Sequence, residues 1–260
     1  MQSQNNGRGK LYIVGTGPGH PDQLTQRAID AVCESEYIIG NNFYMKLIEP
    51  YLKGKTVIRS SMGKEVERAK KCIELADEHV ISMVSGGDPG VYGMASIVLE
   101  VLEREGSDIE VEVIPGVTAA TAAASRIGSP LSGDYVTISL SDLLTPLEVI
   151  RHRLELAFQM DVPVVMYNPK SRGRPHNLSL ALDIAIKHLS GKTPVAVVKN
   201  AFRDGEKYSF STLNELREDN SFVDMHSLVI IGATKTKFWR VNDTIKGLIT
   251  SRGYDRKYVY

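Results

Sequence analysis

The chain has 260 residues, which is long enough for one large domain or for two domains of about 120 residues each. Its 31 basic and 31 acidic residues balance, so no global field attracts nucleic acid or a membrane, and an acidic ligand would need a local basic cluster. No apolar run approaches the roughly 18 residues of a membrane span, and the polar segment 1–10 resembles a loose tail rather than a signal peptide. Cys33 and Cys72 lie far apart without CxxC spacing, which favours a reducing cytoplasm and argues against a zinc or disulfide framework.

Strands and helices alternate through the first half of the chain, because short β-branched runs are separated by segments with apolar residues at helical spacing. Strands are predicted at 10–15, 37–39, 56–58, 79–84 and 109–114, the last at a sheet edge because it alternates apolar and acidic residues. Helices are predicted at 22–33 with Asp22 as cap, 42–52, 64–78 and 91–105.

The segment 85–93, SGGDPGVYG, follows the predicted strand 79–84, which is a short β-branched apolar run, and precedes a helix. In open α/β sheets ligands bind at the carboxyl ends of strands, and glycines there leave backbone polar groups uncovered. Asp88 places one carboxylate in this turn. Two interpretations stay open, since Asp88 is suited either to capping the next helix or to binding a hydroxyl or ammonium group of a cofactor.

Two further glycine turns follow predicted strands. The first, GTGPGHP at 15–21, fits two positions of the GxGxxG dinucleotide fingerprint, but His20 replaces the third glycine and Pro18 removes an amide that a pyrophosphate would use. This disfavours NAD or FAD and leaves a packed turn as the alternative. The second, PGVT at 115–118, opens a helix of small residues at 119–125, which can pack closely on a sheet or on a ligand.

The segment 128–133, GSPLSG, has no periodicity and is the predicted domain boundary. Beyond it strands are predicted at 135–140, 162–167, 193–198, 208–211 and 227–231, and helices at 146–159, 175–189 and 241–249. The sequence therefore predicts two α/β domains, at 10–130 and 134–254.

Three motifs in order, GTGPGHP, SGGDPGVYGMAS and IPGVTAATAAAS, resemble the tetrapyrrole methylase family. Three more, ISLSDLLTP at 138–146, YNPKSRGR at 167–174 and SRGY at 251–254, resemble its branch that methylates C17 of precorrin-3B or cobalt-factor III in cobalamin biosynthesis. The resemblance covers about residues 10–254. It implies two α/β domains with S-adenosylmethionine in the cleft between them, S-adenosylhomocysteine as a product, and a homodimer.

The resemblance also implies which residues bind the cofactor, largely through backbone contacts. These are Pro18, Gly87, Asp88, Val91, Tyr92, Thr118 and Ala119 in the first half, and Tyr167, Asn168, Ala201, Ala233 and Thr234 in the second. In this branch methylation is coupled to ring contraction, which needs acid–base help. Tyr92, Asp142 and Asn168 are the candidates for that role, although no residue pattern identifies the group.

The implied substrate is a corrinoid macrocycle with many carboxylates, so basic residues must cluster to bind it. Lys170, Arg172 and Arg174 fall within five residues after a predicted strand, and arginine binds carboxylates bidentately. An ordinary solvated loop is the alternative. Weaker candidates are Lys64, Arg126 and Lys199.

Methyl transfer from a sulfonium needs no metal or nucleophilic triad, because the donor carries its own leaving group. The six histidines show no HxxxH-type pair and no serine stands in GxSxG, so no metal site or hydrolase elbow is predicted. Orientation of two reactants and exclusion of water are what this chemistry requires. Alternatives within the family are another corrin position, uroporphyrinogen or a protein residue as acceptor. A non-catalytic tetrapyrrole-binding homologue is the alternative outside enzyme chemistry.

Overall fold

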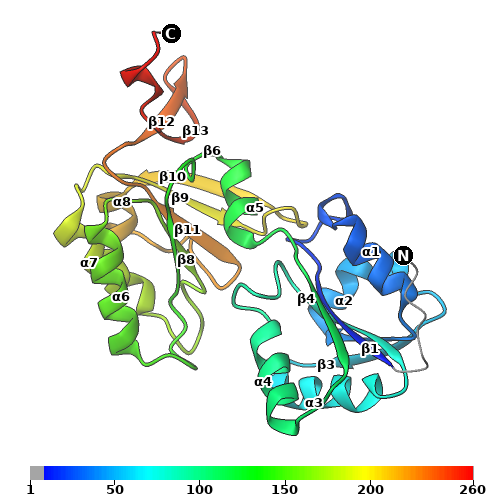
Figure 1. Cartoon of the computed structure of the whole chain (residues 1–260). Helices are drawn as coiled ribbons and strands as arrows, with labels where there is room; N and C mark the ends of the chain where they lie inside the picture. The colour runs from blue at the N-terminus through cyan, green and yellow to red at the C-terminus, as the bar shows by residue number, and fades with distance from the viewer. Residues whose placement is uncertain (1–8, 260) are drawn as a thin grey trace. The chain divides into compact units, whose positions relative to one another are not determined.

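The computed structural model describes residues 9–259, so most of the predicted tail lies outside the described residues. The chain forms two compact α/β units that meet in sequence between Ala119 and Ala120 (Figure 1). This division precedes the predicted boundary because strand β6 (Gly128–Ser129) pairs with a strand of the second unit. Within residues 9–259, no helix combines the length and apolar character that crossing a bilayer requires.

The first unit is built on a five-stranded parallel sheet with the order β3-β2-β4-β1-β5. Its strands are β1 Lys10–Gly15, β2 Tyr37–Asn41, β3 Thr56–Ser60, β4 Val80–Ser85 and β5 Glu110–Ile114. The edge position predicted for the fifth strand is confirmed. Because all five strands run in one direction, their carboxyl ends and the glycine turns that follow β1, β4 and β5 lie at one edge of the sheet.

Helices cover both faces of this sheet. They are α1 Gln26–Glu34, α2 Asn42–Met45, α3 Glu65–Ala76 and α4 Ala95–Glu105, with a 3-10 helix η2 at Lys46–Tyr51. Successive residues of β1 point to opposite faces. Leu11 and Ile13 therefore pack in one cluster with α3 and α4, whereas Tyr12 and Val14 pack in another with α1 and η2.

Two helices of the first unit begin later than predicted. Thr25, rather than Asp22, caps α1, since its side chain accepts a hydrogen bond from the Ala28 amide while residues Pro21–Gln23 form a 3-10 turn. Helix α4 begins at Ala95 and not at residue 91, because Tyr92 has a φ of 53°, which no α-helix accommodates.

The second unit contains a mixed five-stranded sheet with the order β10-β9-β11-β8-β7. Its strands are β7 Val136–Ser139, β8 Val164–Tyr167, β9 Pro194–Lys199, β10 Lys207–Thr212 and β11 Ser227–Ile231. Strand β8 is parallel to β7 and antiparallel to β11, which is itself antiparallel to β9. The carboxyl ends of β7, β8 and β9 therefore share one edge, and β11 ends at the opposite edge.

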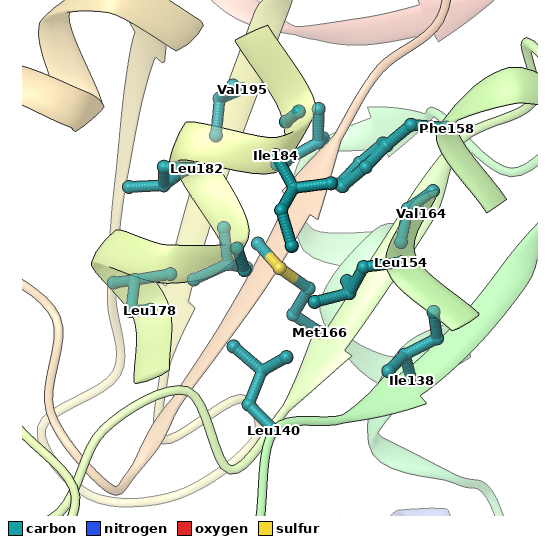
Figure 2. Close-up of a cluster of buried hydrophobic side chains, with 14 of the residues drawn as sticks. Ile138, Leu140, Leu154, Phe158, Val164, Met166, Leu178, Leu182, Ile184 and Val195 are labelled. Carbon is teal, nitrogen blue, oxygen red and sulfur yellow. The ribbon is translucent and has the colours of Figure 1, made fainter. Parts of the chain in front are cut away.

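The core of the second unit lies between one face of this sheet and helices α6 (Leu147–Gln159), α7 (Asn177–His188) and α8 (Leu213–Glu218). Figure 2 shows Met166 of the sheet among Leu154 of α6 and side chains of α7. Helix α8 was not predicted, although Thr212 and Glu215 form its capping box, a signal readable from the TxxE spacing.

The helix predicted at 241–249 is wrong. Residues Thr236–Val241 (β12) and Thr244–Thr250 (β13) form an antiparallel hairpin instead, and β6 pairs with its second strand. The turn consists of Asn242 and Asp243 with φ of 47° and 61°, the left-handed conformation that asparagine and aspartate adopt in two-residue hairpin turns.

Candidate active site

The turns after β1 and β4 are joined by their backbones. The Gly17 amide donates to the Gly87 carbonyl at 3.1 Å, and the Gly87 amide donates back to the Gly17 carbonyl at 2.8 Å. The Thr16 amide extends this pairing by donating to the Ser85 carbonyl at 2.9 Å. Both glycines have a positive φ, 65° and 66°, so glycine is required there for conformation.

The turn after β5 packs against the same two turns without room for a side chain. A Cβ atom on Gly15 would lie 2.6 Å from the Gly116 nitrogen and 2.9 Å from the Gly87 oxygen. One on Gly116 would overlap the Gly87 carbonyl oxygen. Three strand ends are thus held in backbone-to-backbone contact, a function of Gly15 and Gly116 that the sequence analysis did not identify.

The Asp88 carboxylate accepts hydrogen bonds from two of these glycine turns. Its Oδ2 accepts a hydrogen bond from the Gly116 amide at 3.0 Å, and its Oδ1 accepts one from the Gly90 amide at 2.8 Å. The interpretation of Asp88 as a helix cap is wrong, because α4 begins at Ala95 and is preceded by Met94. Asp88 instead connects the turn after β4 to the turn after β5.

The remaining predicted cofactor residues of the first unit lie on these same turns. Pro18 is buried, Val91, Thr118 and Ala119 are half-buried, and Tyr92 is 53% exposed. A Cβ on Gly87 would lie in ordinary van der Waals contact with the 117–119 segment, at 3.7 Å from the Thr118 Cα, so these two turns face each other.

In the second unit, polar side chains gather where β7 and β8 end. The Asn168 amide Nδ2 donates to Ser139 Oγ at 3.0 Å, and the Ser141 backbone amide donates to the same oxygen at 3.2 Å. Buried Asn177 supports this loop from α7 by donating to the Leu140 carbonyl at 2.8 Å. Asn168, one of the predicted catalytic residues, belongs to this network, and Asp142, another, follows Ser141 in the same loop.

Tyr167 has a structural contact that sequence reasoning missed. Its phenolic oxygen accepts a hydrogen bond from the buried Ala120 amide at 2.8 Å. Ala120 is in the first turn of α5 (Ala119–Arg126), the predicted helix of small residues, where amides have no partner within the helix. Tyr167 therefore connects the end of β8 to the start of α5.

The predicted basic cluster is only partly available to a ligand. Lys170 Nζ donates to Asn220 Oδ1 at 2.6 Å, and Arg174 hydrogen-bonds Ser141 and lies 3.9 Å from an oxygen of Asp142. Arg172 is exposed and has no hydrogen-bond or ion-pair partner among residues 9–259. Arg172 is thus the free charge of the three, whereas Lys170 and Arg174 order the loop.

The three weaker basic candidates are each paired with a carboxylate. The partners are Glu67 for Lys64 at 2.6 Å, Glu206 for Arg126 at 2.8 Å and Asp224 for Lys199 at 2.9 Å. Burial alone would raise the pKa of Asp224. Hydrogen bonds from Lys199, the His226 amide and Ser227 together outweigh burial, so the pKa of Asp224 is lowered. That carboxylate is therefore negative at neutral pH and largely neutralises Lys199.

Unusual backbone conformations concentrate at these strand ends. Tyr92, Asn168, Asn200 and Phe202 all have a positive φ, between 50° and 60°. Such conformations cost of order 1–3 kcal/mol each and cluster where a site requires a particular backbone path.

Two predicted cofactor residues lie elsewhere in the second unit. Ala233 and Thr234 follow β11, which runs antiparallel to β8 and β9. The Thr234 amide donates to Asp161, which precedes β8. The structure therefore places them one strand length, about 20 Å, from Asn168 and Ala201, and does not bring them together at one sheet edge.

Comparison with known proteins identifies the family. Residues 10–217 match the family described as Tetrapyrrole (Corrin/Porphyrin) Methylases, which is more than half of the chain. The chain belongs to the tetrapyrrole methylase family. A crystal structure of the methyltransferase CobJ superposes with a TM-score of 0.86 at 31% identity, covering 94% of this chain and all of that one. The α/β fold predicted from the motifs is confirmed.

Two relatives with names from cobalamin biosynthesis match nearly all of this chain. A probable cobalt-factor III C(17)-methyltransferase of Salmonella typhimurium is 43% identical over 245 residues, which are 94% of this chain and 99% of the relative. The cobalamin biosynthesis protein CbiHC of Archaeoglobus fulgidus is 42% identical over 252 residues. That match is 96% of this chain, which spans about half, 54%, of the relative's length.

Proposed function

We propose that the protein transfers a methyl group from S-adenosylmethionine to C17 of a corrinoid precursor, cobalt-factor III or precorrin-3B, with ring contraction, in cobalamin biosynthesis. The observation that carries this proposal is the match to the Salmonella protein, which extends over 99% of that relative at 43% identity. The motifs of the C17 branch agree with that match, and the joined glycine turns support a cofactor held by the backbone.

The first unit is suited to holding the cofactor through its backbone. We propose that Gly87, Val91, Tyr92, Thr118 and Ala119 surround it, with Pro18 at the neighbouring turn. Asp88 acts by positioning, since both of its oxygens already bind amides of the turns. Bound S-adenosylmethionine would supply an electrophilic methyl group and a neutral sulfide leaving group. Rigid turns keep such a group aligned, which reduces the entropic part of the barrier.

The second unit is suited to holding the macrocycle. We propose that Arg172 binds a substrate carboxylate, and that Arg174 and Lys170 fix the loop that presents it. Tyr167, Asn168 and Ala201 lie at the edge where β8 and β9 end, and we propose that they complete the cofactor site. The cleft between the two halves, the cofactor roles of Ala233 and Thr234, and the acid–base roles of Tyr92, Asp142 and Asn168 stay predictions.

The proposal is tested by following a carbon-13 methyl label from S-adenosylmethionine. The protein is incubated with cobalt-factor III and, separately, with precorrin-3B, and the labelled carbon is located by NMR. We expect label at C17 and a ring-contracted product from one of the two acceptors. Label at another ring carbon would assign a different corrin methyltransferase. Saturable cofactor binding without transfer to either acceptor or to uroporphyrinogen would favour a non-catalytic homologue.

The cytoplasmic location and the homodimer also belong to this proposal. Light scattering coupled to size-exclusion chromatography tests the second, with a mass of twice 28.7 kDa expected. A monomeric mass at micromolar concentration would contradict it.

A further inference from the structure

A pocket of about 360 Å³ lies in the first unit beside the start of α3. Its lining is basic, with four cationic side chains and one carboxylate. The charged residues are Arg59, Lys64, Arg68, Lys71 and Glu67. A concentration of one charge in a concave site attracts ligands of the opposite charge, even though the whole chain is neutral.

Arg68 is the side chain that makes this pocket unusual. It is only 5% exposed, and its Nη1 donates to the Ser61 carbonyl at 3.3 Å and to Ser60 Oγ. Its Nη2 lies 3.6 Å from Glu65 Oε1. Its Nε is buried and has no hydrogen-bond acceptor within the described part of the chain. Leaving a charged donor unpaired away from water is costly, so an acceptor supplied by a ligand would stabilise the site.

Arg59 provides a second guanidinium group at the same pocket. It is exposed, and across residues 9–259 it has neither a hydrogen-bond nor an ion-pair partner. Lys64 and Lys71, by contrast, are paired with Glu67 and Glu74 at 2.6 and 2.9 Å. The unpaired charge at the pocket therefore comes from Arg59, and the unpaired donor is the Nε–H of Arg68. Both belong to guanidinium groups, which suit a planar oxyanion better than ammonium groups do.

The pocket adjoins the candidate cofactor turns along one sheet edge. Ser60 ends β3, and β3 and β4 are separated by one strand in the parallel sheet, which corresponds to about 10 Å. Met94 links the two places directly, because its sulfur accepts from Arg68 Nη2 at 3.2 Å while its amide donates to Ser85 Oγ at 3.3 Å. A large ligand at the glycine turns can thus place a side group in this pocket.

We infer that this pocket binds an oxyanion, and that the oxyanion is a carboxylate side chain of the macrocyclic substrate. The inference rests on the proposed function for the identity of the macrocycle, but not for the existence of the anion site. It adds Arg59 and Arg68 to the residues that recognise substrate. The motifs indicated neither of these two arginines.

The test uses the full chain labelled with nitrogen-15 and reads the Arg68 Nε–H resonance, assigned by its loss in Arg68→Lys. The probes are uroporphyrin as a polycarboxylated macrocycle, its fully methyl-esterified form, and inorganic phosphate. We expect a saturable shift with uroporphyrin and none with the ester. Arg59→Gln should weaken uroporphyrin binding by about five-fold, the effect of one charged contact near the surface. The control is Lys70→Gln, which removes the same charge from an exposed position of α3 outside the pocket and should change affinity less than about two-fold.

The outcomes separate this inference from the proposed function. If uroporphyrin shifts the Gly87 amide but not Arg68 Nε–H, the pocket assignment is overturned and methyl transfer is unaffected. A shift with phosphate but not with uroporphyrin would assign a free oxyanion and overturn the substrate assignment. If neither probe shifts this resonance, the anion site itself is refuted. A uroporphyrin shift at Arg68 in a protein that methylates no acceptor would support the pocket and count against the proposed reaction alone.

Discussion

Replacing Gly15 by alanine tests the backbone packing on which the candidate cofactor site depends. Gly15 is the last residue of β1 and is buried where the turns after β4 and β5 meet it. An added Cβ would lie 2.6 Å from the Gly116 nitrogen, 2.9 Å from the Gly116 Cα and 2.9 Å from the Gly87 oxygen. All three are backbone atoms, so no side chain can rotate away to make room.

The size of the effect follows from these distances. Each of these distances is shorter than a favourable van der Waals separation by about half an ångström or more. The turns after β4 and β5 must therefore move away from β1. Overpacking of this kind costs about 1–3 kcal/mol, and the movement also strains the hydrogen bond between Asp88 and the Gly116 amide. We therefore expect Gly15→Ala to lower the free energy of opening of the first unit by about 3 kcal/mol and to weaken S-adenosylhomocysteine binding at least tenfold.

Hydrogen exchange of peptides from β1 and β4 measures the free energy of opening of the first unit. Isothermal titration measures the affinity for S-adenosylhomocysteine. Gly133→Ala is the matched control, because a Cβ there would meet no atom within 4 Å. It should change neither quantity. Wild-type exchange and wild-type affinity in Gly15→Ala would show that the turns are not held in backbone contact, and the cofactor site proposed for the first unit would lose its structural basis.

Three further changes probe other parts of the structure. Asp88→Asn should weaken S-adenosylhomocysteine binding without unfolding the chain, since the two glycine amides bind different carboxylate oxygens and the NH2 group that replaces one of them cannot accept; unchanged affinity by titration would contradict the positioning role. Tyr167→Phe leaves the Ala120 amide without its acceptor and should destabilise the second unit by about 1–3 kcal/mol in urea, whereas wild-type stability would show that this hydrogen bond contributes nothing. The hydrogen bonds from Arg27 lower the pKa of Glu112, so their stabilisation is present above the ordinary carboxyl pKa and disappears as the pH falls through the lowered value. Melting temperatures from about pH 5 to pH 2 should therefore fall less in Arg27→Gln than in the wild type, and an identical pH dependence would refute the assignment.

The sequence by itself determined the strand–helix alternation and the location of the main turns. Buried β-branched runs and glycine-rich segments are local signals, so the strands at β1, β4 and β8 and the turn at 85–93 were predicted correctly. Ordered motifs were also enough to indicate the family. The helix predicted at 241–249 failed because a short apolar segment fits either periodicity, and the Asn-Asp turn signal was not used.

Only the tertiary structure decided what the site residues do. A sequence cannot show that Asp88 bonds an amide 28 residues away, or that Gly15 and Gly116 meet, because these contacts depend on strand order. Strand direction likewise separates Thr234 from Asn168, although both follow strands. Local preference specifies which segments become strands, whereas the pairing of distant strands determines which of their ends come together.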